Sequence, residues 1–84
     1  MSEGYAGDVQ KLILEVSKAL VDHPDEVEVE AIQEGGTLVL ELSVAESDMG
    51  RIIGRAGRTA KALRALLSAS AFRSGQRCSL EILE

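Results

Sequence analysis

The first part of the chain carries apolar residues at helical spacing. Residues 1–7 contain two glycines and are interpreted as a flexible tail, and Asp8 is a residue type that begins helices. Apolar side chains then recur three or four positions apart, namely Val9, Leu12, Ile13, Val16 and Leu20. Pro24 disfavours helical geometry at His23. This predicts that the helix ends there and that His23 is a loop residue rather than a ligand.

From residue 27 onward the apolar positions alternate with polar ones, which is typical of half-buried strands. The alternation covers residues 27–30, 38–44 and 78–82, and the Glu-Gly-Gly-Thr segment at 34–37 is a hairpin-turn signal. Six residues are predicted to face the core: Val27, Val29, Leu38, Leu40, Leu42 and Val44. Four are predicted to face water: Glu28, Glu30, Glu41 and Ser43. Cys78 is interpreted as a small, buried strand residue.

Two further helices are predicted between the second and third strands. A short one begins at residues 46–48, where two acids favour a first turn, and continues to about Ile53. After a break at 54–57, a longer helix runs from Arg58 to about Phe72. Its predicted inward residues are Ala60, Leu63, Leu66, Leu67, Ser70 and Ala71. Phe72 is interpreted as a core residue at the helix end.

The resulting order of elements is α-β-β-α-α-β, in one domain that occupies residues 8–84. A three-stranded sheet with one apolar face must cover that face with the helices. The sequence therefore predicts an α/β (α+β) two-layer sandwich with the helices on one side. The bare face of the sheet is predicted to be acidic, since the outward strand positions are mostly glutamates.

Composition excludes several classes of protein. The single cysteine excludes an intramolecular disulfide and a cysteine-rich metal site, so no metal or other cofactor is expected. One histidine, one cysteine and serines without a nearby base do not meet the requirements of a catalytic site. The chain is therefore predicted not to be an enzyme. No signal peptide or apolar membrane span is present, which predicts a cytoplasmic protein.

Positive charge is concentrated in one part of a chain whose net charge is −5. Residues 51–77 hold seven of the nine Lys and Arg residues and none of the fourteen Asp and Glu residues. Such asymmetry indicates a local anion-binding face on an otherwise acidic body.

The segment RIIGRAGRTAKAL, residues 51–63, is the candidate anion-binding site within that part. A nucleotide-binding P-loop would need a glycine where Ile52 stands and a lysine where Arg58 stands. The Gly-x-Gly-x-x-Gly fingerprint of dinucleotide-binding proteins is also absent. A nucleotide cofactor is therefore excluded, and the backbone of a nucleic acid is the favoured ligand.

The same segment resembles the K-homology (KH) signature, in which an aliphatic pair precedes a Gly-x-x-Gly loop between two helices. That loop holds about four single-stranded nucleotides. The order of elements matches the type II KH arrangement. The stretches LVDHPDEVEVE, LELSVAESDMGRIIGRAGRTAKALRALLSA and CSLEILE resemble the KhpA family of small bacterial single-KH RNA-binding proteins.

The RNA-binding residues predicted from the motif and its physics lie in and after the loop. They are Ile53, Gly54, Arg55, Ala56, Gly57, Arg58, Lys61 and Arg64. The glycines allow close approach of a sugar–phosphate chain, and the helix that follows presents free N–H groups to phosphate. The resemblance implies a groove between the loop helices and the last strand, with either Ser79 or Leu80 at its edge.

Two functions remain open at this point. The favoured one is binding of single-stranded RNA, and the alternative is a protein-interaction module in which RNA binding is secondary. The resemblance implies homodimers and a heterodimer with a larger KH-containing protein of the KhpB (Jag/EloR) kind. It also implies roles in RNA chaperoning, post-transcriptional regulation, cell-wall biogenesis and cell shape. Val39 and Leu83, apolar on a polar face, are candidate interface residues.

Overall fold

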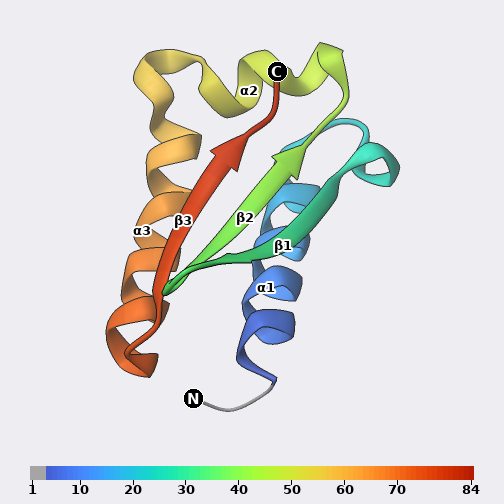
Figure 1. Cartoon of the computed structure of the whole chain (residues 1–84). Helices are drawn as coiled ribbons and strands as arrows, with labels where there is room; N and C mark the ends of the chain where they lie inside the picture. Colours follow the sequence, from blue (N-terminus) through green and yellow to red (C-terminus); the bar gives the residue numbers. More distant parts are fainter. Residues whose placement is uncertain (1–3) are drawn as a thin grey trace.

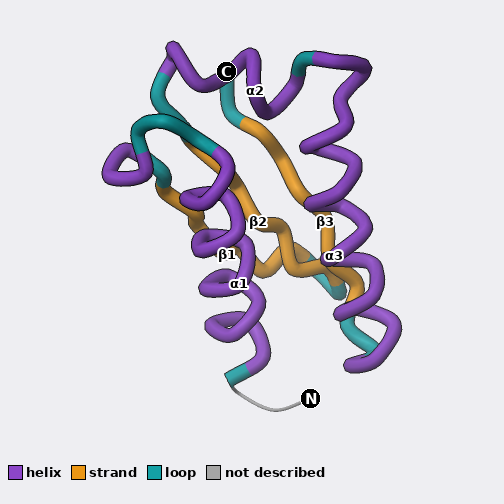
Figure 2. The backbone as a smooth tube through the Cα atoms, turned by 180° about the vertical axis from the view of Figure 1, so that it is seen from behind, coloured by secondary structure: helices purple, strands orange, loops and turns teal. Residues whose placement is uncertain are grey.

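A computed structural model describes residues 4–84, the side chain of Arg55 excepted. The elements are α1 (Tyr5–Leu20), β1 (Glu28–Glu34), β2 (Thr37–Ser43), α2 (Met49–Ile53), α3 (Arg58–Ser74) and β3 (Arg77–Ile82). Figure 1 shows the sheet in front, with α1 and α3 behind it and α2 across one end. The reverse view shows both long helices covering one face of the sheet (Figure 2). The predicted two-layer fold and its order of elements are confirmed.

The first helix begins at Tyr5, earlier than the predicted start at Asp8. The hydroxyl of Tyr5 lies 2.9 Å from Oγ of Ser70 and 3.3 Å from Sγ of Cys78, so this residue is held against α3 and β3. These tertiary contacts extend the helix into part of the predicted tail. Residues 1–3 of that tail lie outside the described residues.

The sheet has the order β1-β2-β3, with β1 antiparallel and β3 parallel to the central strand. Gly35 has φ 59°, the left-handed conformation that a tight hairpin between β1 and β2 requires. On the outer face, Glu41 of β2 is paired with Glu30 of β1 and Glu81 of β3. A row of three carboxylates therefore crosses the uncovered face, as the strand pattern predicts.

The core lies between this sheet and the helices. It contains Val9, Ile13, Val27, Val29, Leu38, Leu40, Leu42, Ile52, Leu63, Leu67 and Leu80. Five of the six strand residues predicted to face inward are buried, and Val44 packs partly buried against them. Cys78 is partly buried rather than fully enclosed. The alternation of the strands therefore placed the core correctly.

The helices bury narrower stripes than predicted. Leu12 and Leu20 of α1 and Leu66 of α3 are each about two-fifths exposed, because α1 buries only the line through Val9 and Ile13. Three strands offer a narrow surface, so side chains at the margin of each helical stripe stay in contact with solvent.

The interpretation of Phe72 as a core residue is wrong. Its side chain is 91% exposed. Phe72 follows the buried Leu67 by five residues, which corresponds to about 140° around an α-helix. Its position on the helix therefore points it away from the sheet.

Candidate nucleic-acid interface

The loop between α2 and α3 has a backbone that its glycines make possible. A Cβ on Gly54 would collide with the carbonyl oxygen of Gly50, so no larger residue fits there without a shift. Ala56 and Gly57 have φ of 61° and 69°, both left-handed. The N–H of Gly57 donates to the carbonyl oxygen of Gly54 at 2.9 Å. The result is a tight turn that leads directly into α3.

The N-terminus of α3 is open towards solvent at this turn. None of the described side chains caps the helix at Gly57. The first N–H groups of a helix lack partners within the helix, and the helix dipole favours a negative charge beside them. Arg58 and Lys61 are exposed and lie one turn apart on the same helix. This geometry suits a phosphate group.

The cations of residues 51–77 differ in their pairing. Among the described residues, none of the ion pairs involves Arg58, Lys61 or Arg64. Arg51 is instead neutralised, with Nη2 at 2.9 Å from Oδ2 of Asp22. The side chain of Arg55, also predicted to bind RNA, lies outside the described part of the structure. The unpaired charge therefore follows α3 rather than α2.

A groove of about 370 Å³ runs beside the loop, between α3 and β3. It is lined by Ile53, Gly57, Ala60, Arg64, Leu80, Glu81, Ile82 and Glu84. Of the predicted site residues, the structure brings Ile53, Gly57 and Arg64 together here. Ile53 is 41% exposed and supplies an apolar wall. Glu81 and Glu84 add negative charge to the same groove.

A second hollow of about 200 Å³ continues along the same seam and is lined by Arg64, Leu67, Ser68, Cys78, Ser79 and Leu80. Arg64 and Leu80 line both hollows, and Nη2 of Arg64 donates to the carbonyl oxygen of Leu80 at 3.3 Å. Ser79 lines only the second hollow. Of the two strand residues that the resemblance offers for the groove edge, Leu80 therefore lines the groove beside the loop, and Arg64 lies at the junction of the two hollows.

A buried acid, at the position where the sequence predicts the first turn of the short helix, fixes the other end of α2. Asp48 is 1% exposed. Its Oδ1 accepts the backbone N–H of Asp22, and its Oδ2 accepts the backbone N–H of His23, each at 3.0 Å. The ring Nδ1 of His23 lies 3.0 Å from the same Oδ2. Asp48 thereby joins the turn after α1 to the start of α2.

These contacts shift the pKa values of both partners. The hydrogen bond to Asp48 is the main reason that the pKa of His23 lies above its ordinary value of 6.5. Burial alone would raise the pKa of Asp48, but the hydrogen bonds from residues 22 and 23 outweigh it and lower that pKa. No local sequence signal marks this contact, because its partners lie some 25 residues apart in the chain.

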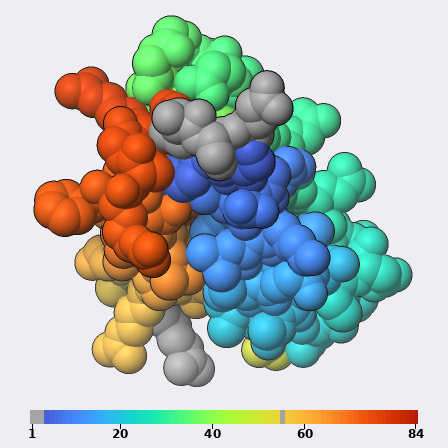
Figure 3. Space-filling view, turned by 90° about the horizontal axis from the view of Figure 1, so that it is seen from below, coloured from blue at the N-terminus to red at the C-terminus, as the bar shows by residue number. Residues whose placement is uncertain are grey.

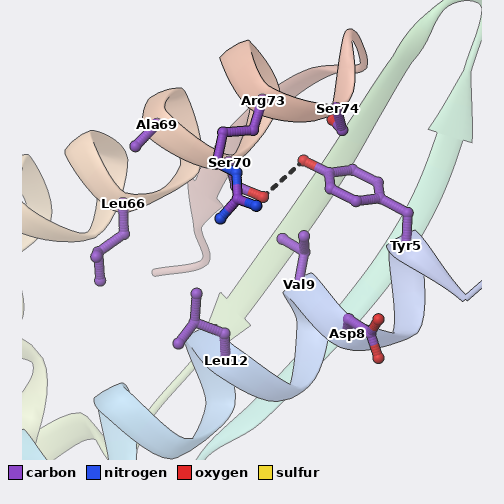
Figure 4. A pocket seen from close by; sticks show the side chains of 9 residues that line it. All are labelled: Tyr5, Asp8, Val9, Leu12, Leu66, Ala69, Ser70, Arg73 and Ser74. Atoms are coloured by element: carbon purple, nitrogen blue, oxygen red, sulfur yellow. Dashed lines mark hydrogen bonds between the residues drawn. The ribbon is translucent and has the colours of Figure 1, made fainter.

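A further hollow, of about 570 Å³, lies away from the loop, between α1 and α3. Figure 4 shows Leu12 and Leu66 directed towards each other across it, with the hydroxyl of Tyr5 bonded to Ser70 at one end. Arg73 also points into this cleft (Figure 4). The cleft is apolar at its centre and has the character of a contact surface rather than of a phosphate site.

Residues 4–84 show neither a membrane-spanning helix nor a metal-binding cluster. None of the helices in that range is both long and apolar enough to cross a membrane. The same residues contain no group of three or more His, Cys, Asp or Glu side chains placed to hold a metal ion.

The sequence of the chain is similar to a known family of KH domains and to several of its members. The family model described as KhpA/KhpB, KH domain matches residues 10–82. The chain is 45% identical to the RNA-binding protein KhpA of Halalkalibacterium halodurans, over 90% of this chain and 100% of that protein. It is 46% identical to the RNA-binding protein KhpA of Borreliella burgdorferi, over 95% and 96% of the two chains. A protein of the same name from Chlamydia pneumoniae is also 46% identical, over 90% and 97%.

Proposed function

The chain belongs to the KhpA/KhpB family of KH domains, and on this premise we propose that it binds single-stranded RNA. The observation that carries the proposal is the groove between α3 and β3, which opens beside a glycine-bounded loop and unpaired cations. A KH loop of this kind holds about four nucleotides. The family is one of RNA-binding proteins rather than enzymes, which confirms the expectation that the chain has no catalytic role.

In this proposal the loop and the groove have separate tasks. The backbone of Gly54–Gly57 and the start of α3 receive a phosphate, and Arg55, Arg58 and Lys61 supply positive charge around it. Unstacked bases lie against the apolar wall formed by Ile53 and Leu80. The grip on the backbone is independent of sequence, because phosphates carry no sequence information.

The test is a charge reversal in the loop. The double variant Arg55→Asp with Ala56→Asp is expected to lose RNA binding in fluorescence anisotropy while its circular dichroism is unchanged. A matched control, Lys11→Asp with Ala19→Asp, makes the same change of charge at exposed positions of α1. It should retain most of the affinity. Retained RNA binding by the loop variant would overturn the proposal.

Salt dependence offers an independent measurement of the same contacts. If about three phosphates are bound, the slope of log K against log salt concentration should be near −2, since each single-strand contact contributes about −0.7. The loop variant should have a shallower slope than the wild type. A flat response of the wild type would contradict the electrostatic part of the proposal.

We further propose that the protein acts as a dimer, either with itself or with a KhpB (Jag/EloR)-like protein. The half-exposed Leu12 and Leu66 in the cleft between α1 and α3 favour this surface. Of the earlier candidates, Val39 is partly buried, whereas Leu83 is 44% exposed and stays a second candidate for such a surface. Family membership supports a cytoplasmic role in RNA chaperoning and post-transcriptional regulation, connected to cell-wall biogenesis and cell shape.

Sedimentation velocity with and without RNA separates the two functions. Leu66→Glu places a charge in the cleft and is expected to give a monomer that still binds RNA, although less tightly where two sites act together. If the wild type forms dimers at micromolar concentration and binds no RNA below millimolar, the protein-interaction function is the correct one.

A further inference from the structure

Phe72 is an aromatic side chain with no packing role. It is 91% exposed, more than any other large apolar residue of the described chain. Tyr5, the other aromatic residue of the sequence, is held between α1, α3 and β3 through Ser70 and Cys78. A phenyl ring held in water costs free energy that a ligand could recover by covering it.

The ring lies on the same face of α3 as the candidate phosphate-binding residues. Phe72 follows Lys61 by eleven residues, which is three helical turns with about 20° of drift. It follows Ser68, which lines the second hollow of the groove, by one turn. The rise of an α-helix places it about 17 Å beyond Lys61. The groove therefore leads from the loop towards this ring.

The charge around the ring also suits a nucleic acid. Residues 51–77 contain no acidic residue, and Arg77 is exposed at the start of β3, just beyond the end of α3. Seen from below, the end of α3 and the start of β3 form one side of the molecule, next to the start of α1 (Figure 3). Arg73 differs, because it points into the cleft between the helices (Figure 4).

We propose that Phe72 is a second RNA contact, on which a base stacks when the strand is long enough to reach past the loop. The inference rests on the proposed function, because the loop must hold the strand first. Stacking on an aromatic ring accepts any base, so this contact adds affinity without adding a sequence requirement. RNA is favoured over a protein partner here because of the basic surroundings of the ring.

The experiment compares RNA lengths. Random pools of four- and ten-nucleotide RNA are titrated against the wild type, Phe72→Ala, Phe72→Leu and Phe72→Trp in fluorescence anisotropy. Phe72→Ala is expected to lower affinity for the longer RNA by about 5- to 150-fold, the range for loss of one base–aromatic stack, and to leave the shorter RNA unaffected. Phe72→Leu should behave like the alanine variant, and Phe72→Trp should retain the affinity.

The tryptophan variant reports on the contact directly, because the natural chain contains no tryptophan. Its fluorescence should be quenched by the ten-nucleotide RNA and not by the four-nucleotide RNA. Three results would each overturn the inference. Phe72→Ala could bind both RNAs as the wild type does, or Phe72→Leu could retain full affinity. The tryptophan emission could instead shift with protein concentration in the absence of RNA, which would show that the ring contacts protein.

Failure of the proposed function has a different signature. In that case the wild type binds neither RNA, or the Arg55→Asp, Ala56→Asp variant binds both as well as the wild type does. The first result would overturn the Phe72 contact as well. Both contacts are supported together by three results. The wild type binds both RNAs, the loop variant binds neither, and Phe72→Ala no longer binds the ten-nucleotide RNA more tightly than the four-nucleotide RNA.

Discussion

The helix α2 is only five residues long, and the segments at its two ends are built in opposite ways. At its N-terminal end, the carboxylate of Asp48 is buried and accepts hydrogen bonds from two backbone N–H groups. At its C-terminal end, Ala56 and Gly57 adopt left-handed backbone conformations, and Arg58 is exposed without an ion pair among the described residues. One end is held by tertiary contacts and the other is left open.

This difference explains how so short a helix can present a loop. Ile52 is the one buried residue of α2, so apolar packing alone holds it weakly. Asp48 adds a polar anchor on the side away from the loop. The loop can then keep its shape through its own glycines and remain free of contacts that a ligand would have to displace.

Removing the anchor is expected to have the largest effect. Asp48→Ala leaves two backbone N–H groups and the ring of His23 without their acceptor, and unpaired buried donors are costly. The melting temperature should fall further than in His23→Ala, which removes a single donor, and RNA affinity should fall with it. Equal melting temperatures for the two variants would show that the carboxylate is not the anchor.

Breaking the open end directly is expected to come second. In Gly54→Ala the new methyl group meets the carbonyl oxygen of Gly50, so the backbone must shift, at about 1–3 kcal/mol for overpacking. RNA binding should be lost in fluorescence anisotropy, and the loss of stability should appear in urea unfolding. Gly50→Ala is the matched control: its Cβ meets open space, and alanine favours the helix by about 0.5–1 kcal/mol.

The left-handed pair inside the loop permits a finer comparison. Gly57→Ala has space for its methyl group but must keep φ at 69°, so it should lose about 1–2 kcal/mol of stability. Ala56→Gly relieves the same strain at φ 61° and should gain less than about 1 kcal/mol, because glycine is more flexible when unfolded. The two variants should change the free energy of unfolding, measured with urea, in opposite directions. A change in the same direction for both would contradict this explanation.

The smallest effect concerns pH at the anchored end. Because the hydrogen bond to Asp48 raises the pKa of His23, the stability that His23 contributes is fully present below about pH 6.5 and is lost as pH rises through the raised pKa. The stability that Asp48 contributes is fully present above about pH 3.8, its ordinary pKa. It is lost as pH falls through the lowered pKa of the folded protein. His23→Gln should flatten the decline in unfolding free energy between pH 6 and 8. Asp22, Glu26 and Arg51 also lie nearby and are unchanged in this comparison.

Much of the fold could be predicted because it depends on local patterns. The alternation of the strands identified Leu38, Leu40 and Leu42 as core residues, and the glycine pair at 35–36 marked the hairpin turn. The margins of the helices could not be assigned in this way. Whether Leu12 is covered depends on how wide the neighbouring layer is, which no single segment of the sequence records.

The site was predictable to a similar degree. The spacing of Gly54 and Gly57 indicated the loop, and the resemblance indicated the groove beside β3. Asp48 was missed because an acid in a first helical turn is usually solvated, and its partners come from a distant turn. Phe72 was misplaced because an aromatic residue near a helix end is more often buried, whereas its angle from Leu67 points it outward.

The row formed by Glu30, Glu41 and Glu81 has a consequence for how molecules of this protein meet. A three-stranded sheet with an uncovered face and two free edges is prone to stack on, or extend into, another sheet. Stacking two such faces would bring six carboxylates together in a dry interface, where repulsion is strong. We expect this row to keep concentrated protein from aggregating through its sheets at neutral pH.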